Sequence, residues 1–184
     1  INAVKQVQVK ESWKNLSGAA IQPAPADVPD IIKNILVPIN AQKGDLLPVS
    51  AFKGMEDGTM PLGTSQYEKR GIATHLPVWD SSECIQCNMC SFVCPHAVIR
   101  PYLLDEKEAA NAPAGMVLVD AKGPKMDGLK YTMGVSTLDC TSCGSCVSSC
   151  PKSGKALKMV PTHEVSLDQT NWEYLFGLPV KGDR

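Results

Sequence analysis

Eight cysteines constrain this chain more than any other feature, because they form two quartets with identical spacing. The two quartets are Cys84, Cys87, Cys90 and Cys94, and then Cys140, Cys143, Cys146 and Cys150. A proline follows the last cysteine of each quartet, and no cysteine lies outside them. Eight thiols gathered in two short stretches predict two metal-binding loops of the same design.

Each quartet reads C-x2-C-x2-C-x3-C-P, a spacing that binds 4Fe–4S clusters. Three thiolates with two residues between neighbours let a short loop hold three corners of a cubane. The three-residue gap then turns the chain away, and the proline suits the first turn of a helix. We therefore expect the fourth cysteine of each quartet to serve the cluster of the other quartet.

This exchange predicts two ligand sets. The first cluster is expected to bind Cys84, Cys87, Cys90 and Cys150, and the second Cys94, Cys140, Cys143 and Cys146. No catalytic residue is expected, because the sequence shows no nucleophile–base pair and no phosphate-binding loop. The chain is therefore predicted to move electrons one at a time and to transform no substrate by itself.

Two other uses of the cysteines fit the spacing less well. Four disulfides would have to join closely spaced cysteines, which bridge poorly. Two zinc sites of four thiolates each would use C-x2-C pairs, but a zinc ribbon has no use for a third cysteine at the same spacing or for the terminal C-P.

The side chains between the cysteines differ between the two loops, although neither loop contains a charged residue. The first loop is covered by the apolar Ile85, Met89, Phe92 and Val93. The second is rich in hydroxyls, and Gly144 and Ser145 are expected to let backbone N–H groups approach the sulfurs. Because hydrogen bonds to sulfur stabilise the reduced form, we expect the second cluster to have the higher potential.

Composition favours a soluble segment of a larger protein. The chain has 184 residues, an apolar share of 43% and a net charge of −1. No apolar stretch approaches the roughly 20 residues that cross a bilayer, and no signal peptide is visible. Free ferredoxins are usually more acidic, and the chain lacks an initial Met. We therefore expect a cytoplasmic relay built into a larger polypeptide, with no nucleic-acid or membrane partner.

The predicted fold class is α+β. We expect an extended, largely irregular arm and linker at 1–72, and then a two-cluster ferredoxin-like domain at 73–161. That domain would contain a long insertion at about 101–139, and a C-terminal connecting segment would follow at 162–184. The expected strands lie at 2–9, 73–79, 116–120, 129–137 and 156–160. The expected helices lie at 29–37, where Pro38 would stop the helix, directly after the proline of each quartet, including 95–98, and at 171–176, ending at Gly177.

Two stretches beyond the cysteine spacing resemble a known family. The first is the run from Lys53 to Thr64, continued by residues 67–73 and Pro77-Val78-Trp79. The second is the first quartet together with its continuation to Pro101. Both resemble the region around the clusters of pyruvate:ferredoxin (flavodoxin) oxidoreductases, and the resemblance covers nearly the whole chain.

The resemblance implies an enzyme of anaerobic metabolism that converts pyruvate and CoA to acetyl-CoA and CO2. Such an enzyme uses thiamine diphosphate, Mg²⁺ and a third 4Fe–4S cluster, none of which this chain would hold. It passes electrons to ferredoxin or flavodoxin and is usually a cytoplasmic homodimer. Two alternatives stay open: a self-standing ferredoxin-type carrier, and the iron–sulfur segment of another 2-oxoacid oxidoreductase.

Overall fold

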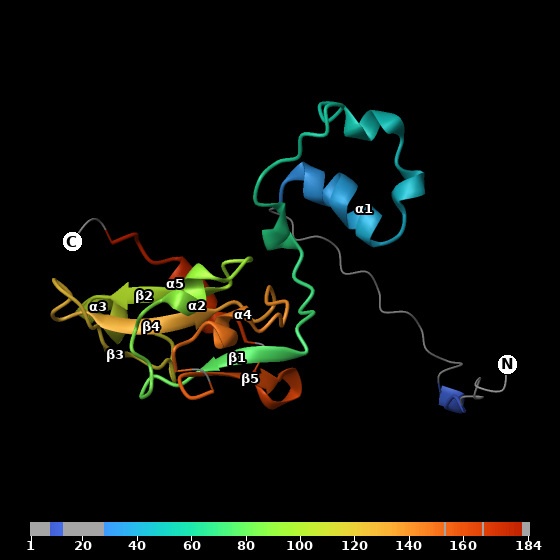
Figure 1. Cartoon of the computed structure of the whole chain (residues 1–184). Coiled ribbons are helices and arrows are strands. Elements are labelled where there is room, and N and C mark those ends of the chain that lie inside the picture. The colour runs from blue at the N-terminus through green and yellow to red at the C-terminus, as the bar shows by residue number, and fades with distance from the viewer. Residues whose placement is uncertain (1–7, 13–27, 153, 167, 182–184) are drawn as a thin grey trace. The chain divides into compact units, whose positions relative to one another are not determined.

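The computed structural model describes residues 8–12, 28–152, 154–166 and 168–181 (Figure 1). The chain divides into two units, Ile1–Glu68 and Lys69–Arg184, which are described separately below. Most of the strand expected at 2–9 lies outside the described residues. Among the described residues, no helix is both long enough and apolar enough to cross a membrane.

In the second unit, a two-stranded sheet joins the beginning of the cysteine region to its end. Strand β1 (His75–Trp79) pairs antiparallel with β5 (Leu157–Pro161), and Pro77 lies opposite Met159 (Figure 1). Leu76 and Leu157 are both 2% exposed and lie on opposite faces of this sheet, so each face carries a buried side chain. Both strands occur where the sequence predicted them.

The segment between the quartets forms a second sheet of three antiparallel strands. Strand β2 (Ile99–Leu104) pairs with β4 (Lys130–Val135), and β4 pairs with β3 (Val119–Asp120). The two predicted strands of this segment are confirmed as the β3–β4 hairpin. Strand β2 was not predicted. Pro101 lies inside it and is tolerated because β2 is an edge strand.

Two four-residue helices lie inside the cysteine quartets, α2 (Met89–Phe92) and α4 (Ser145–Ser148). The helix predicted for 95–98 was wrong, because Ala97 has a positive φ of 51° and the chain forms a turn there. The described residues that follow the second quartet also form turns before β5 begins. In each quartet the short helix therefore ends before the Cys-Pro pair.

Two further helices flank the three-stranded sheet. Helix α3 (Glu106–Ala110) begins with a capping box formed by Asp105 and Glu108, in which each side chain accepts from the backbone N–H of the other residue. Helix α5 (Thr170–Phe176) ends at Gly177, as predicted, and buries Leu175. A 3-10 turn, Thr162–Glu164, links β5 to the segment before α5.

The first unit contains a π-helical turn, Ile32–Leu36, that continues directly into α1 (Val37–Asn40). The predicted stop at Pro38 was wrong. The N–H of Val37 bonds to the carbonyl of Ile32, five residues back, and Pro38 then occupies the first turn of α1, where a proline costs little. Three 3-10 turns follow, at Gly44–Leu46, Val49–Phe52 and Thr64–Tyr67.

The core of the second unit contains cysteines as well as hydrocarbon side chains. Its larger cluster comprises Ile99, Tyr131, Met133, Cys146 and Leu157. Three other cysteines pack against these residues at their margin, namely Cys90, Cys94 and Cys150. The two sheets and the two short helices therefore meet at the cysteine quartets.

Candidate iron–sulfur sites

Two small cavities of equal size, about 20 Å³ each, lie between the sheets and the short helices of the second unit. Four cysteines line each of them. Cavity one is lined by Cys84, Cys87, Cys90 and Cys150. Cavity two is lined by Cys94, Cys140, Cys143 and Cys146. These are the same two groups of four that the sequence predicted to lie together.

The exchange of the fourth cysteine follows from how the chain is folded. Helices α2 and α4 contact each other, and β1 pairs with β5, so the end of each quartet lies beside the beginning of the other. Cys94 therefore lines the cavity of the second quartet, and Cys150 lines that of the first. All eight cysteines are free thiols.

The donor set and its arrangement fit a cluster of several atoms. In the part of the chain that the structure describes, no three His, Cys, Asp or Glu side chains converge closely enough to hold a single metal ion. The cysteines instead line the two cavities in groups of four. Four thiolates around such a cavity are the ligand set of a 4Fe–4S cluster.

The cysteines differ in burial and therefore in acidity. Burial, together with the neighbouring cysteine sulfurs, raises the pKa of Cys90 and of Cys146 to about 11. Hydrogen bonds from Ser145 lower the pKa of the exposed Cys143. The buried thiols would stay protonated on their own, so iron has to displace their protons when it binds.

The two loops share one backbone conformation, which brings N–H groups to sulfur. Gln86 and Asn88 have positive φ angles of 58° and 60°, and the equivalent Ser142 and Gly144 have 62° and 75°. In each loop the first of these residues donates its N–H to the sulfur of the first cysteine, 3.4 Å away for Gln86 and 3.5 Å away for Ser142. The two loops with the same cysteine spacing therefore have the same backbone conformation.

Loop two (residues 140–150) has hydroxyl contacts to sulfur that loop one (residues 84–94) lacks. The Oγ of Ser145 lies 3.5 Å from the Sγ of Cys143. Among the atoms of the described residues, a Cβ added at Gly144 would meet nothing within 4 Å, so the expected close approach of this backbone to a cluster stays a prediction. Glycine suits this position because of its left-handed backbone, and Ser142 supplies the N–H to Cys140.

Several side chains other than the cysteines also lie at the sites. Tyr131 from β4 lines cavity one, and its ring centroid lies 6.0 Å from that of Trp79, which also lines the cavity. Burial raises the pKa of Tyr131, so its phenol stays protonated and acts as a donor. His96, which follows Cys94 and Pro95 in the chain, lines cavity two. Only the fold could place Tyr131, which lies far from the first quartet in sequence.

Comparisons with known proteins agree with this arrangement. A family model described as a 4Fe-4S dicluster domain matches residues 83–156, and one described as a domain of unknown function, EKR, matches residues 19–73. The match to the dicluster domain supports two 4Fe–4S clusters in the region of the two cavities.

Curated relatives match along nearly the whole chain. A pyruvate-flavodoxin oxidoreductase of Enterobacter agglomerans is 47% identical over 187 residues, which cover 100% of this chain and 15% of that protein. A pyruvate:ferredoxin oxidoreductase of Moorella thermoacetica is 46% identical over 183 residues, which cover 97% of this chain and 15% of that protein. A pyruvate dehydrogenase [NADP(+)] of Cryptosporidium parvum is 48% identical over 159 residues, 86% of this chain and 8% of that protein. The chain thus spans only a small part of the proteins that it matches.

Proposed function

This chain belongs, as one segment, to the family of the pyruvate-flavodoxin and pyruvate:ferredoxin oxidoreductases, and we propose that it is their two-cluster electron relay. One observation carries the proposal: two cavities of nearly equal size are each lined by four cysteines, and the last cysteine of each quartet lies at the other cavity. Each 4Fe–4S cluster supplies a one-electron redox centre when it is bound.

The ligands that we propose are the eight cysteines in the groups that line the cavities. Cluster one takes Cys84, Cys87, Cys90 and Cys150, and cluster two takes Cys94, Cys140, Cys143 and Cys146. The other residues of the chain shield the clusters and tune them. Trp79 and Met133 cover cavity one with apolar surface, whereas the hydroxyl of Ser145 lies 3.5 Å from the Sγ of Cys143 at cavity two. No residue of the chain is assigned a catalytic role.

The reaction belongs to the parent enzyme. We propose that the parent converts pyruvate and CoA to acetyl-CoA and CO2 on thiamine diphosphate and Mg²⁺, and that it holds a third 4Fe–4S cluster outside this chain. The two electrons released would pass singly through the relay to ferredoxin or flavodoxin. The names of the relatives support pyruvate as the substrate and these two acceptors. A cytoplasmic homodimer is the assembly that we expect.

The division of the chain that we propose keeps the boundaries drawn from the sequence. Residues 73–161 form the ferredoxin-like domain, with an insertion at about 101–139, between an arm at 1–72 and a connecting segment at 162–184. The break between Glu68 and Lys69 and the end of the EKR match at residue 73 both lie near the first boundary.

Reconstitution of the 184-residue chain tests the relay. With iron and sulfide, the chain should bind two 4Fe–4S clusters and accept electrons from a strong reductant, but it should not turn over pyruvate with thiamine diphosphate and CoA. Cys94→Ala should damage the signal of cluster two and spare that of cluster one, as measured by EPR and iron content. Pyruvate turnover by the chain alone, or damage confined to cluster one, would overturn the assignment.

A further inference from the structure

Both cysteine loops depend on left-handed residues, but they obtain this conformation in different ways. In loop one the two left-handed positions are Gln86 and Asn88, and in loop two they are Ser142 and Gly144. Glycine adopts positive φ freely, whereas a residue with a Cβ does so at a cost, which is smallest for asparagine and aspartate. Loop one has no glycine, so bonds from outside the loop can stabilise its conformation.

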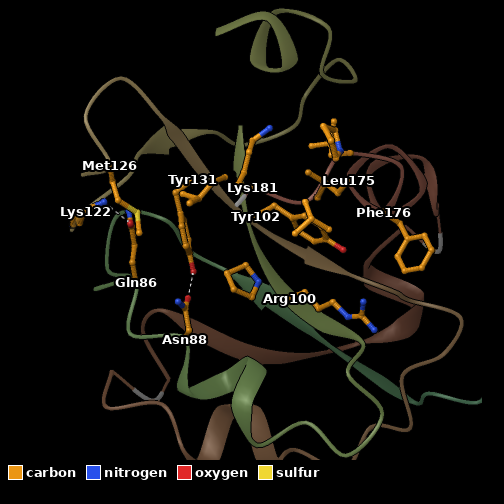
Figure 2. A pocket seen from close by; sticks show the side chains of 15 residues that line it. Gln86, Asn88, Arg100, Tyr102, Lys122, Met126, Tyr131, Leu175, Phe176 and Lys181 are labelled. Carbon is orange, nitrogen blue, oxygen red and sulfur yellow. Dashed lines mark hydrogen bonds between the residues drawn. The ribbon is translucent and has the colours of Figure 1, made fainter. Parts of the chain in front are cut away.

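Tyr131 holds the second of these positions. Its phenol donates to the Oδ1 of Asn88 across 2.8 Å, as Figure 2 shows. Tyr131 is 3% exposed and belongs to β4, whose pairing with β2 and β3 fixes its backbone. The side chain of Asn88 is therefore anchored to the middle strand of the three-stranded sheet.

Backbone groups at the end of β3 bond to the first left-handed residue of loop one, Gln86. The Nε2 of Gln86 donates to the carbonyl of Asp120 across 2.9 Å, and the N–H of Lys122 donates to the Oε1 of Gln86 across 2.8 Å. One amide side chain thus bonds to two backbone groups on either side of Ala121. Both left-handed residues of loop one are bonded to the same inserted sheet.

Loop two has no such connection to that sheet among the bonds of the described residues. Ser142 is bonded from the other side, where its Oγ accepts the N–H of His75 at 3.0 Å and lies 3.3 Å from the Oγ1 of Thr74. Gly144 has no side chain to hold and takes its φ of 75° freely. The inserted sheet therefore contacts the two loops unequally.

We propose that the sheet β2–β4–β3 is a brace for cluster one, in which Tyr131 and Gln86 are positioning residues that hold loop one in its cluster-binding conformation. The inference rests on the proposed function, because it assumes that loop one binds a cluster. It gives the long segment between the quartets a role: its hydrogen bonds hold the loop of cluster one.

The brace also separates cluster one from solvent. A cavity of about 520 Å³ is lined by Gln86, Asn88, Lys122 and Tyr131, among other residues (Figure 2). Tyr131 lines both this cavity and cavity one. Loss of the bond between Tyr131 and Asn88 should therefore both loosen loop one and ease the access of small molecules to its cluster.

Iron release from the reconstituted full chain tests the brace, with a chelator as the probe. In Tyr131→Phe, the half of the iron that belongs to cluster one should be released about fivefold to tenfold faster, the effect of one lost hydrogen bond. The other half should be released at the wild-type rate. Gln86→Ala, which loses two bonds, should act on the same half, and Ser142→Ala should act on the opposite half.

Rescue separates positioning from a general loss of stability. Asn88→Gly supplies a residue that needs no anchor, so Tyr131→Phe should have no further effect in that background. The EPR spectrum and potential of cluster one should shift in Tyr131→Phe and return in the double variant. Equal acceleration of both halves, or an undiminished effect of Tyr131→Phe in the Asn88→Gly background, would overturn the brace. A wild-type chain that takes up no iron would instead overturn the proposed function as well.

Discussion

The hydroxyl of Ser145 distinguishes the surroundings of the two clusters at the scale of single residues. It lies 3.5 Å from the Sγ of Cys143, whereas the equivalent residue in loop one is the apolar Met89. A hydrogen bond worth about 1 kcal/mol more to the reduced cluster corresponds to roughly 40 mV for a one-electron couple. Ser145→Ala should therefore lower the potential of cluster two by about that amount, as measured by EPR-monitored redox titration.

The matched control is Met89→Ser, which places a hydroxyl at the equivalent position of loop one. It should raise the potential of cluster one and leave that of cluster two unchanged. The order expected from the sequence, with cluster two higher, stays a prediction until both potentials are known. An unchanged cluster two in Ser145→Ala would show that the hydroxyl does not tune it.

Single residues also show what a sequence can and cannot predict here. The grouping of the cysteines could be predicted, because the spacing itself forces the fourth cysteine away from its own loop. The left-handed conformations of Gln86 and Asn88 could not, because neither residue type requires a positive φ. Only Gly144 gave such a signal, because glycine is the residue that adopts a positive φ most freely. The hydrogen bond from Tyr131 depends on strand pairing that no local pattern encodes.

At the scale of elements, α5 packs closely against β4 at Gly134. A Cβ added at Gly134 would lie 2.9 Å from both the Cδ1 of Leu175 and the Cε2 of Tyr102. Since Leu175 is 1% exposed, it has little room to move. Gly134→Ala should lower the free energy of unfolding by roughly 1–3 kcal/mol, which chemical denaturation of the reconstituted chain would measure.

Gly44→Ala is the matched control for this substitution. Its Cβ would meet only the Cγ1 of Ile39, at an ordinary contact distance of 3.6 Å, and its φ is not positive. The variant should be neutral or slightly more stable, because alanine reduces the freedom of the unfolded chain. If both variants behaved alike, the close packing at Gly134 would not be the cause.

Two helix boundaries were predicted wrongly, and both predictions relied on a proline. Proline was expected to begin a helix at Pro95 and to end one at Pro38. In the structure, the left-handed Ala97 prevents the first, and the π-helical turn before Val37 accommodates the second. Strands were predicted better, because β1, β3, β4 and β5 each lie within a run of apolar and β-branched residues.

In the whole molecule, the cysteines of the second unit belong to its core, so its stability should depend on iron. Cys146 is part of the larger core cluster, and Cys90, Cys94 and Cys150 pack against it. The first unit contains no cysteine and buries Val28, Ile32 and Ile35 instead. Since metal binding is coupled to folding, removal of the clusters should loosen the second unit only.

Hydrogen–deuterium exchange of the reconstituted chain, before and after its iron is removed with a chelator under reducing conditions, measures this difference. Exchange should become faster in β1, β5, α2 and α4, because these elements position the two groups of cysteines. It should not change in the turn Ile32–Leu36 or in α1, because both belong to the first unit, which contains no cysteine. Equal loss of protection in both units would mean that the clusters stabilise the chain as one body. No change in either unit would mean that the protein fold alone, without iron, holds the eight cysteines in place.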